Sequence, residues 1–201
     1  MIAVIDYGAG NLFSVSNALD YLNIAYAVTK DAQVIDRADA VILPGVGAFP
    51  AAMQALNASG LTDTIRENAA KKPLLGICLG MQMLFEDSDE MEPCKGLGLI
   101  NGHVHRIPSQ QVIIPHMGWN ELVITQDCPL LKGIEKPVYT YFVHSYQAYC
   151  ADSSLVAYAE YDGRIPALVT DGKFVFGAQF HPEKSGEKGL QMLRNFEEMA
   201  R

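Results

Sequence analysis

Short runs of hydrophobic residues alternate with amphipathic stretches over the first half of the chain. A β-branched run at residues 2–5 ends in a glycine-rich turn, after which hydrophobic residues recur at helical spacing from Leu12 to Leu22. The same order returns at residues 40–43, before a Pro-Gly-Val-Gly break, and at residues 74–77, before another helical stretch. Repeated strand–loop–helix units predict a parallel sheet joined by right-handed crossovers.

The second half consists mainly of short, strand-like runs. Two Asp-Gly dipeptides, at residues 162–163 and 171–172, favour tight hairpins and indicate antiparallel pairing. The last segment, residues 185–201, carries a hydrophobic stripe at helical spacing and begins with Ser185, a typical N-cap residue. We therefore expect one α/β domain over residues 1–201. Its mostly parallel central sheet should be flanked by helices, with additional antiparallel strands in the C-terminal half.

The composition is that of an ordinary globular protein and argues against several kinds of partner. Of 201 residues, 49% are hydrophobic and 19% are charged, which is not a disordered composition. The formal net charge of -8 argues against broad contact with nucleic acid or an anionic membrane, since both favour clustered Lys and Arg. The first hydrophobic run has no basic flank and stops at Asp6, so it resembles neither a signal peptide nor a membrane span. We expect a cytoplasmic protein with reduced cysteines.

One cysteine lies in a pattern typical of a catalytic nucleophile. Cys78 follows an apolar run, has glycines at positions 76 and 80, and precedes a helical stretch. In a nucleophile elbow the reactive residue sits in a sharp strand-to-helix turn, and the neighbouring glycines relieve crowding. The turn would place the sulfur at a helix N-terminus, which favours thiolate, and would offer the Leu79 amide to an oxyanion. Alone, the pattern is equally compatible with a buried structural cysteine. The remaining cysteines lack flanking glycines and are assigned no role: Cys94, Cys128 and Cys150.

A candidate base and a carboxylate follow the last predicted strand. His181 and Glu183 stand two residues apart, with Pro182 between them, and in extended backbone such residues point the same way. Glu183 could then orient the imidazole, as the third member of a triad does. On its own, His181 would more often be a capping or core histidine. Its combination with the Cys78 elbow favours a catalytic base.

Together these segments resemble the class I, or triad, glutamine amidotransferases. The signatures of that family are a Gly-x-Cys-x-Gly-x-Gln elbow, present at residues 76–82, and a late His-Pro-Glu, present at residues 181–183. The resemblance implies hydrolysis of L-glutamine to glutamate and ammonia, without a cofactor or a metal. It makes Cys78 the nucleophile that attacks the side-chain amide, His181 the group that protonates the departing ammonia, and Glu183 the group that orients His181.

The resemblance also implies an oxyanion hole and a substrate pocket. The oxyanion would accept hydrogen bonds from the backbone of Leu79 and of the loop that contains Val46 and Gly47. The residues implied to hold glutamine, the last three through their backbone, are Gln82, Glu90, His144, Ser145 and Tyr146.

Further segments narrow the resemblance to one subfamily, the glutaminase subunits that pass ammonia to a separate (β/α)8-barrel cyclase in histidine biosynthesis. These segments are residues 6–12, 44–47, 115–120, 141–146 and 179–185. A heterodimer with a sealed path makes chemical sense, because ammonia released into neutral water would mostly protonate. The residues expected on the docking face are Asn11, Pro115, Met117, Trp119 and Tyr141. For Met117 and Tyr141, a position in the core is an equally good interpretation.

The residues leave other functions open. A glutaminase subunit of an anthranilate or nucleotide synthase would share the elbow and the His-Pro-Glu. A cysteine hydrolase of the α/β-hydrolase type shares the elbow, but its acid normally precedes the histidine in the chain. A metal-binding module would have to use residues that lack the spacing typical of zinc sites, namely Cys94, His103, His105, His116 and His144.

Overall fold

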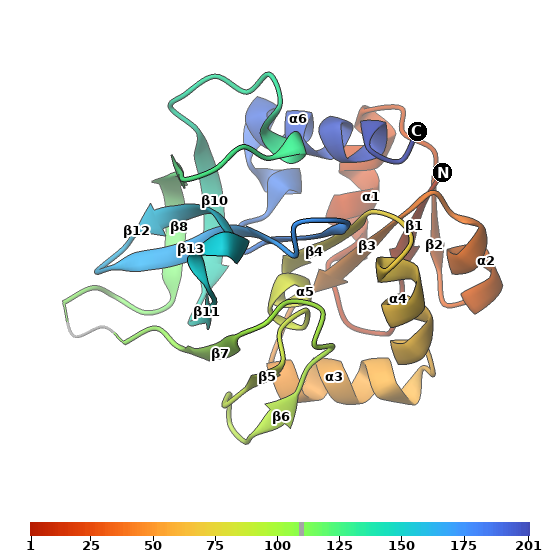
Figure 1. The fold of residues 1–201 in the computed structure, drawn as a ribbon, viewed down its shortest axis with the longest axis horizontal. Helices are drawn as coiled ribbons and strands as arrows, with labels where there is room; N and C mark the ends of the chain where they lie inside the picture. The colour runs from red at the N-terminus through yellow and green to blue at the C-terminus, as the bar shows by residue number, and fades with distance from the viewer. Residues whose placement is uncertain (109–110) are drawn as a thin grey trace.

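A computed structural model of the chain describes residues 1–108 and 111–201. Within these residues the largest sheet has eight strands in the order β2-β1-β3-β4-β14-β13-β12-β9, with helices packed on it (Figure 1). From β2 to β14 in this order, neighbouring strands are parallel, and from β14 to β9 they are antiparallel. The expected α/β fold, parallel first and antiparallel in its C-terminal half, is confirmed.

Up to β4, helices separate the strands, as the hydrophobic pattern predicts, and two helices, α3 and α4, lie between β3 and β4. The strands of the large sheet are β1 (Ile2–Ile5), β2 (Tyr26–Thr29), β3 (Ala40–Gly45), β4 (Leu74–Cys78), β9 (Val123–Ile124), β12 (Leu155–Glu160), β13 (Arg164–Thr170) and β14 (Val175–Ala178). The α-helices are α1 (Leu12–Tyr21), α2 (Ala32–Arg37), α3 (Phe49–Ala58), α4 (Thr62–Ala69), α5 (Leu79–Gln82) and α6 (Gly186–Glu198). Short 3-10 helices are η1 (Pro129–Leu131), η2 (Asp152–Ser154) and η3 (Pro182–Lys184).

Two smaller sheets lie beside the large one in the described part of the chain. They contain the strand expected near residues 138–143, and also short strands that the sequence pattern did not indicate. One pairs β8 (His116–Glu121) with β10 (Tyr139–His144) in antiparallel register. The other has the order β11-β7-β5-β6, and its strands are β5 (Asp87–Ser88), β6 (Cys94–Lys95), β7 (His103–Arg106) and β11 (Tyr146–Tyr149). The strands of these two sheets thus build a separate wall beside the large sheet (Figure 1).

Helices cover both faces of the parallel part of the sheet, because its strands are apolar on both faces. Along β1, Ala3 and Ile5 belong to the same buried cluster as residues of α2, α3 and α4, whereas Ile2 and Val4 belong to the cluster with α1 and α6. Figure 1 shows α1 and α6 together on one side of the sheet, and α3 and α4 on the other. The continuous hydrophobic runs of the sequence are what a strand buried on both faces requires.

Helix α6 begins where the sequence predicts, but Ser185 does not cap it with its side chain. Ser185 is the N-cap residue, and its hydroxyl makes no capping hydrogen bond. The hydroxyl instead donates to the His181 carbonyl at 2.6 Å and accepts from the Tyr141 amide at 3.0 Å. The prediction of a side-chain cap is wrong, since Ser185 ties the segment that carries His181 to β10.

The turn between β4 and α5 lies directly against the end of β3. A Cβ added to Gly80 would lie 1.9 Å from the Leu43 carbonyl oxygen, and one added to Gly45 would lie 2.5 Å from the Gly80 nitrogen. A Cβ on Gly76 would lie 2.6 Å from the Gly80 oxygen. Strand β3 pairs with β4 as far as Gly45 and Cys78. The glycines of the elbow are therefore needed for close backbone packing.

Replacing Gly80 with alanine should break this contact. Because the new Cβ would meet backbone atoms that cannot rotate away, we expect the free energy of unfolding to fall by about 3 kcal/mol. Urea denaturation followed by circular dichroism measures this loss. Gly60→Asn is the control, since Gly60 has a φ of +74° in open space. Asparagine tolerates that conformation, so its loss should stay below about 1 kcal/mol. Equal losses in the two variants would contradict the role of close packing.

Candidate active site

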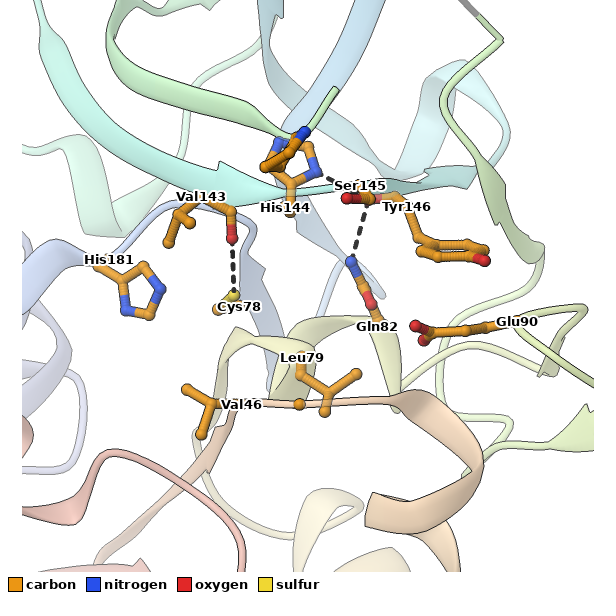
Figure 2. A pocket seen from close by; sticks show the side chains of 12 residues that line it. Val46, Cys78, Leu79, Gln82, Glu90, Val143, His144, Ser145, Tyr146 and His181 are labelled. Atoms are coloured by element: carbon orange, nitrogen blue, oxygen red, sulfur yellow. Dashed lines mark hydrogen bonds between the residues drawn. The ribbon is translucent and has the colours of Figure 1, made fainter. Parts of the chain in front are cut away.

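Cys78 occupies a strained turn at the carboxyl end of β4. Its φ of 55° and ψ of -112° are unusual for a residue with a side chain, and such strain costs on the order of 1–3 kcal/mol. The residue immediately precedes helix α5, so the predicted nucleophile-elbow geometry is present. The thiol is 3.9 Å from the Val143 carbonyl oxygen and lines a pocket of about 330 Å³ (Figure 2).

His181 and Glu183 meet beside Cys78 in spite of a backbone that differs from the prediction. The sequence suggested an extended link, and His181 is indeed extended, with a φ of -100° and a ψ of 96°, but the 3-10 turn η3 begins at Pro182. The turn still brings His181 Nδ1 within 2.7 Å of Glu183 Oε1, and both side chains are almost fully buried, at 3% and 1% exposure. Ala178, at the end of β14, pairs with Ile77, so the two segments leave the sheet next to each other.

The charge balance at His181 favours the imidazolium form. Burial by itself would lower the pKa of His181, but hydrogen bonding and attraction from Cys78 and Glu183 outweigh burial and raise the pKa to about 9. Nδ1 is hydrogen-bonded to Glu183 Oε1. Nε2 is buried and has no hydrogen bond of ordinary length to the described residues. In Figure 2 a ring nitrogen of His181 points toward the Cys78 sulfur. His181 is therefore able to exchange a proton with the thiol.

The pocket gathers residues from distant segments. With Cys78 and His181, it is lined by Val46, Gly47, Leu79, Gln82, Glu90, Pro115, Val143, His144, Ser145 and Tyr146. The structure thus brings together every residue that the sequence suggested for the nucleophile, the base, the oxyanion hole and substrate binding. Glu183 lies behind His181, where an orienting carboxylate belongs. The individual roles remain predictions.

The loop with Val46 and Gly47 is held at both ends. Before it, the Tyr7 hydroxyl donates to the Pro44 carbonyl at 3.0 Å, and after it, Glu90 Oε2 accepts from the Phe49 amide at 2.8 Å. Between these anchors Gly47 has a φ of +100° and open space around its Cα. Tyr7 is close enough to Cys78 that burial and the thiolate charge both raise the tyrosine pKa. Tyr7 lies within the segment 6–12 that carries the family resemblance, but sequence reasoning assigned it no role.

Two buried glutamines connect the pocket wall to the nucleophile. Gln82 Nε2 donates to the Tyr146 carbonyl at 3.0 Å and to Gln179 Oε1 at 2.9 Å. Gln179 Nε2 in turn lies 4.0 Å from Cys78 Sγ. Sequence reasoning missed Gln179 as a site residue. A fully buried amide at the end of an otherwise apolar strand could have revealed it, because such a group needs partners.

The remaining cysteines and histidines do not form a second site. Burial is the main cause that raises the thiol pKa values of Cys94, Cys128 and Cys150, the last to about 11. His103 and His105 are half exposed and pair with Asp87 and Asp89. Within residues 1–108 and 111–201, no three His, Cys, Asp or Glu side chains cluster as a metal site would require. In the same residues no helix is both long and apolar enough to cross a membrane.

The suggested docking residues differ in exposure. Met117 and Trp119 are 60% and 54% exposed, so a core position is wrong for Met117. Pro115 is also exposed, and Tyr141 is half-buried, with its ring edge-on to Trp119 at 6.2 Å. The Asn11 side chain accepts a hydrogen bond from the Ser14 amide and caps α1, which gives Asn11 a structural use.

The fold and the site together define an α/β enzyme in which a buried Cys-His-Glu group opens into a small pocket. The sequence matches the family described as "Glutamine amidotransferase class-I" over residues 3–199. The chain belongs to this family.

Curated relatives are similar along the whole chain. It is 50% identical to "Imidazole glycerol phosphate synthase subunit HisH" of Bacillus cereus (strain ATCC 14579), over 98% of this chain and 94% of that one. It is 48% identical to the subunit of the same name from Listeria monocytogenes serotype 4b (strain CLIP80459), over 100% and 97%. A solved structure described as a glutamine amidotransferase superposes with a TM-score of 0.77 at 20% identity, over 100% of this chain and 99% of that chain. This last likeness supports the fold.

A glutamine-like chloroketone should label Cys78 in preference to the other three cysteines at neutral pH. Only Cys78 combines a strained turn with a neighbouring imidazolium, whereas burial keeps the other thiols protonated. Peptide mapping by mass spectrometry identifies the labelled thiol. His181→Asn is the control variant, and its Cys78 should react at least about 10-fold more slowly. Even labelling of all four cysteines would show that the site activates none of them.

Proposed function

We propose that this chain is the glutamine-hydrolysing subunit of an imidazole glycerol phosphate synthase. It would convert L-glutamine to glutamate and ammonia, and a separate subunit would use the ammonia to make imidazole glycerol phosphate and AICAR in histidine biosynthesis. The observation that carries the proposal is one pocket in which Cys78, His181 and the suggested glutamine-binding residues meet. Full-length identity of 48–50% to subunits of that name supports the choice among synthases.

The reaction follows from the arrangement of the three side chains. The Cys78 thiolate attacks the side-chain amide carbon of glutamine, and the carbonyl oxygen becomes a tetrahedral oxyanion. His181 donates a proton to the amide nitrogen, the C–N bond breaks, and ammonia leaves a γ-glutamyl thioester on Cys78. His181 then accepts a proton from water as the water attacks the thioester, which releases glutamate and the thiolate. Glu183 holds the imidazole through Nδ1 and stabilises its charged form.

The backbone at two turns would stabilise the oxyanion. The Leu79 amide follows the nucleophile directly, and the Val46–Gly47 loop faces the same pocket. One such donor typically changes the rate by about 100-fold to 1000-fold. Because Gly47 has open space and both loop ends are anchored, a rotation of this peptide could supply or withdraw a donor at low cost. We therefore infer that the isolated subunit is a slow glutaminase.

Glutamine itself would be held by a carboxylate that binds its ammonium group and by backbone hydrogen bonds from the pocket wall. Glu90 lines the pocket and offers a carboxylate to the substrate ammonium group. The segment from Val143 to Tyr146 forms the opposite wall in Figure 2, where Gln82 supports it from below. No cofactor enters this chemistry.

The partner we propose is a (β/α)8-barrel cyclase bound as a heterodimer. Its docking face would include the exposed side chains of Met117 and Trp119 on β8, next to the pocket residue Pro115. A face beside the pocket allows ammonia to pass directly into the partner before it protonates in water. We expect the pair to act in the cytoplasm, where the four free cysteines stay reduced.

Cys78→Ala should abolish glutamine-dependent synthesis in the complex with the cyclase subunit while added ammonium salt still supports synthesis. The thiol produces ammonia and does not consume it, so only the first activity depends on Cys78. Both activities are measured as product formed by the same purified complex. Cys94→Ala is the control and should retain both. Equal loss of the two activities in Cys78→Ala would assign Cys78 to folding or docking instead.

Trp119→Ala should weaken binding of the cyclase subunit by about 30-fold, the usual cost of a central aromatic at an interface. Isothermal titration calorimetry gives the dissociation constant. Phe174→Ala is a matched control, since Phe174 is also exposed but precedes β14 at the end remote from the pocket. Unchanged affinity for Trp119→Ala, with normal folding, would remove Trp119 from the docking face.

A further inference from the structure

Two buried histidines lie side by side behind the wall of the pocket. His116 is on β8 and His144 on β10, and they are directly opposite each other in the antiparallel ladder. His116 Nδ1 is 3.0 Å from His144 Nε2, and the two side chains are 0% and 6% exposed. The mechanism proposed above assigns no task to either ring, although His144 lines the pocket.

The contacts of His144 fix the direction of its hydrogen bonds. His144 Nδ1 lies 2.7 Å from the Tyr146 carbonyl oxygen, which can only accept, so Nδ1 carries a hydrogen. Burial is the main cause that lowers the pKa of His144, to about 3, and the ring is therefore neutral at neutral pH. Its Nε2 then has a free lone pair and accepts from His116 Nδ1. The bonds run in one direction, from His116 through His144 to Tyr146.

Two aromatic rings hold His116 in place. The Phe142 ring stacks on one side with centroids 4.7 Å apart and an interplanar angle of 22°, and the Tyr161 ring stacks at 4.0 Å and 23°. A ring stacked on two neighbouring rings cannot rotate without displacing them. The position of His116 is therefore fixed to β8, β10 and the residue that follows β12.

The Tyr146 carbonyl is the point where this chain of bonds enters the site. It accepts from His144 on one side and from Gln82 Nε2 at 3.0 Å on the other. Gln82 also donates to Gln179, whose amide lies 4.0 Å from Cys78 Sγ. In Figure 2 the ring of His144 lies above the 143–146 segment, and the Gln82 side chain approaches the same segment from below. A displacement of His144 would alter the part of the wall that faces glutamine.

The strand of His116 also carries the proposed docking face. Along β8, His116 points inward, whereas the next residue, Met117, and then Trp119 point outward and are exposed. A shift of β8 on docking would move the donor in the 3.0 Å contact with His144. A hydrogen bond is weak beyond about 3.5 Å, so a shift of β8 by well under 1 Å would weaken the contact with His144 and loosen the pocket wall.

We propose that His116 and His144 are positioning residues that hold the Tyr146 carbonyl and couple the docking strand β8 to the glutamine pocket. This inference rests on the proposed glutaminase function, and it gives a physical route by which partner binding on β8 would affect the glutamine pocket. The ring of His144 does not touch the substrate in this arrangement. It supports the wall that does, and His116 supports the ring.

The test compares two replacements of His116 in the complex with the cyclase subunit. His116→Phe keeps a ring between the two aromatic faces but removes the donor, whereas in His116→Asn the amide nitrogen occupies the place of Nδ1 and retains it. For His116→Phe we expect the KM for glutamine to rise about 10-fold, the usual effect of one lost hydrogen bond, with kcat changed less. The stimulation of glutaminase by the partner should fall to less than half of its wild-type value. His116→Asn should restore both toward wild type.

His144→Asn gives the same comparison from the other side. Its amide nitrogen still donates to the Tyr146 carbonyl, but the shorter side chain no longer reaches His116, so we expect the KM rise and the loss of stimulation seen in His116→Phe. This variant decides the question if His116→Phe does not fold. A wild-type KM and full stimulation in folded His116→Phe or His144→Asn would overturn the inference while leaving the proposed function intact. Equal defects in His116→Phe and His116→Asn would also overturn it. An inactive wild-type complex would instead defeat the proposed function and this inference with it.

Discussion

The close approach of β3 to the turn at Cys78 is the constraint on which the site depends. Gly80 can lie against the Leu43 carbonyl only because it has no Cβ, and Gly45, two residues further along β3, contacts the same turn. This contact fixes the strained backbone of Cys78 and the start of the loop with Val46 and Gly47. The nucleophile and the proposed oxyanion donors therefore share one rigid support. The strain at Cys78 is tolerated because the packing around it leaves no other conformation.

Burial of the Cys-His-Glu group sets its chemistry. Desolvation opposes a charged imidazole, yet the partners of His181 on both sides more than offset it. Ser185 bonds both the His181 carbonyl and the Tyr141 amide, so the histidine segment is fixed to the strand beside the docking face. The same region thus links the catalytic side chains, the pocket wall and the surface proposed for the partner.

Much of the parallel half of the fold is predictable because local patterns of hydrophobic residues and glycines determine it. Strands buried on both faces give continuous hydrophobic runs, and the elbow requires glycines at fixed spacing. Most of the wall built from the two smaller sheets was not predictable, since strands such as Asp87–Ser88 are two residues long and polar. Its pairing depends on contacts between distant segments. For the same reason the family resemblance suggested roles for Gln82 and His144 but none for Tyr7 or Gln179, whose contacts are tertiary.

The central claim is that Cys78 attacks glutamine and carries the glutamyl group. The most direct measurement is mass spectrometry of the partner-bound enzyme after rapid acid quench during glutamine turnover. We predict a γ-glutamyl thioester on the Cys78 peptide, which disappears when glutamine is exhausted. It should be absent from His181→Asn, because that variant cannot protonate the departing nitrogen. Glutamine turnover with no adduct on Cys78, but with one on Cys94, Cys128 or Cys150, would contradict the account.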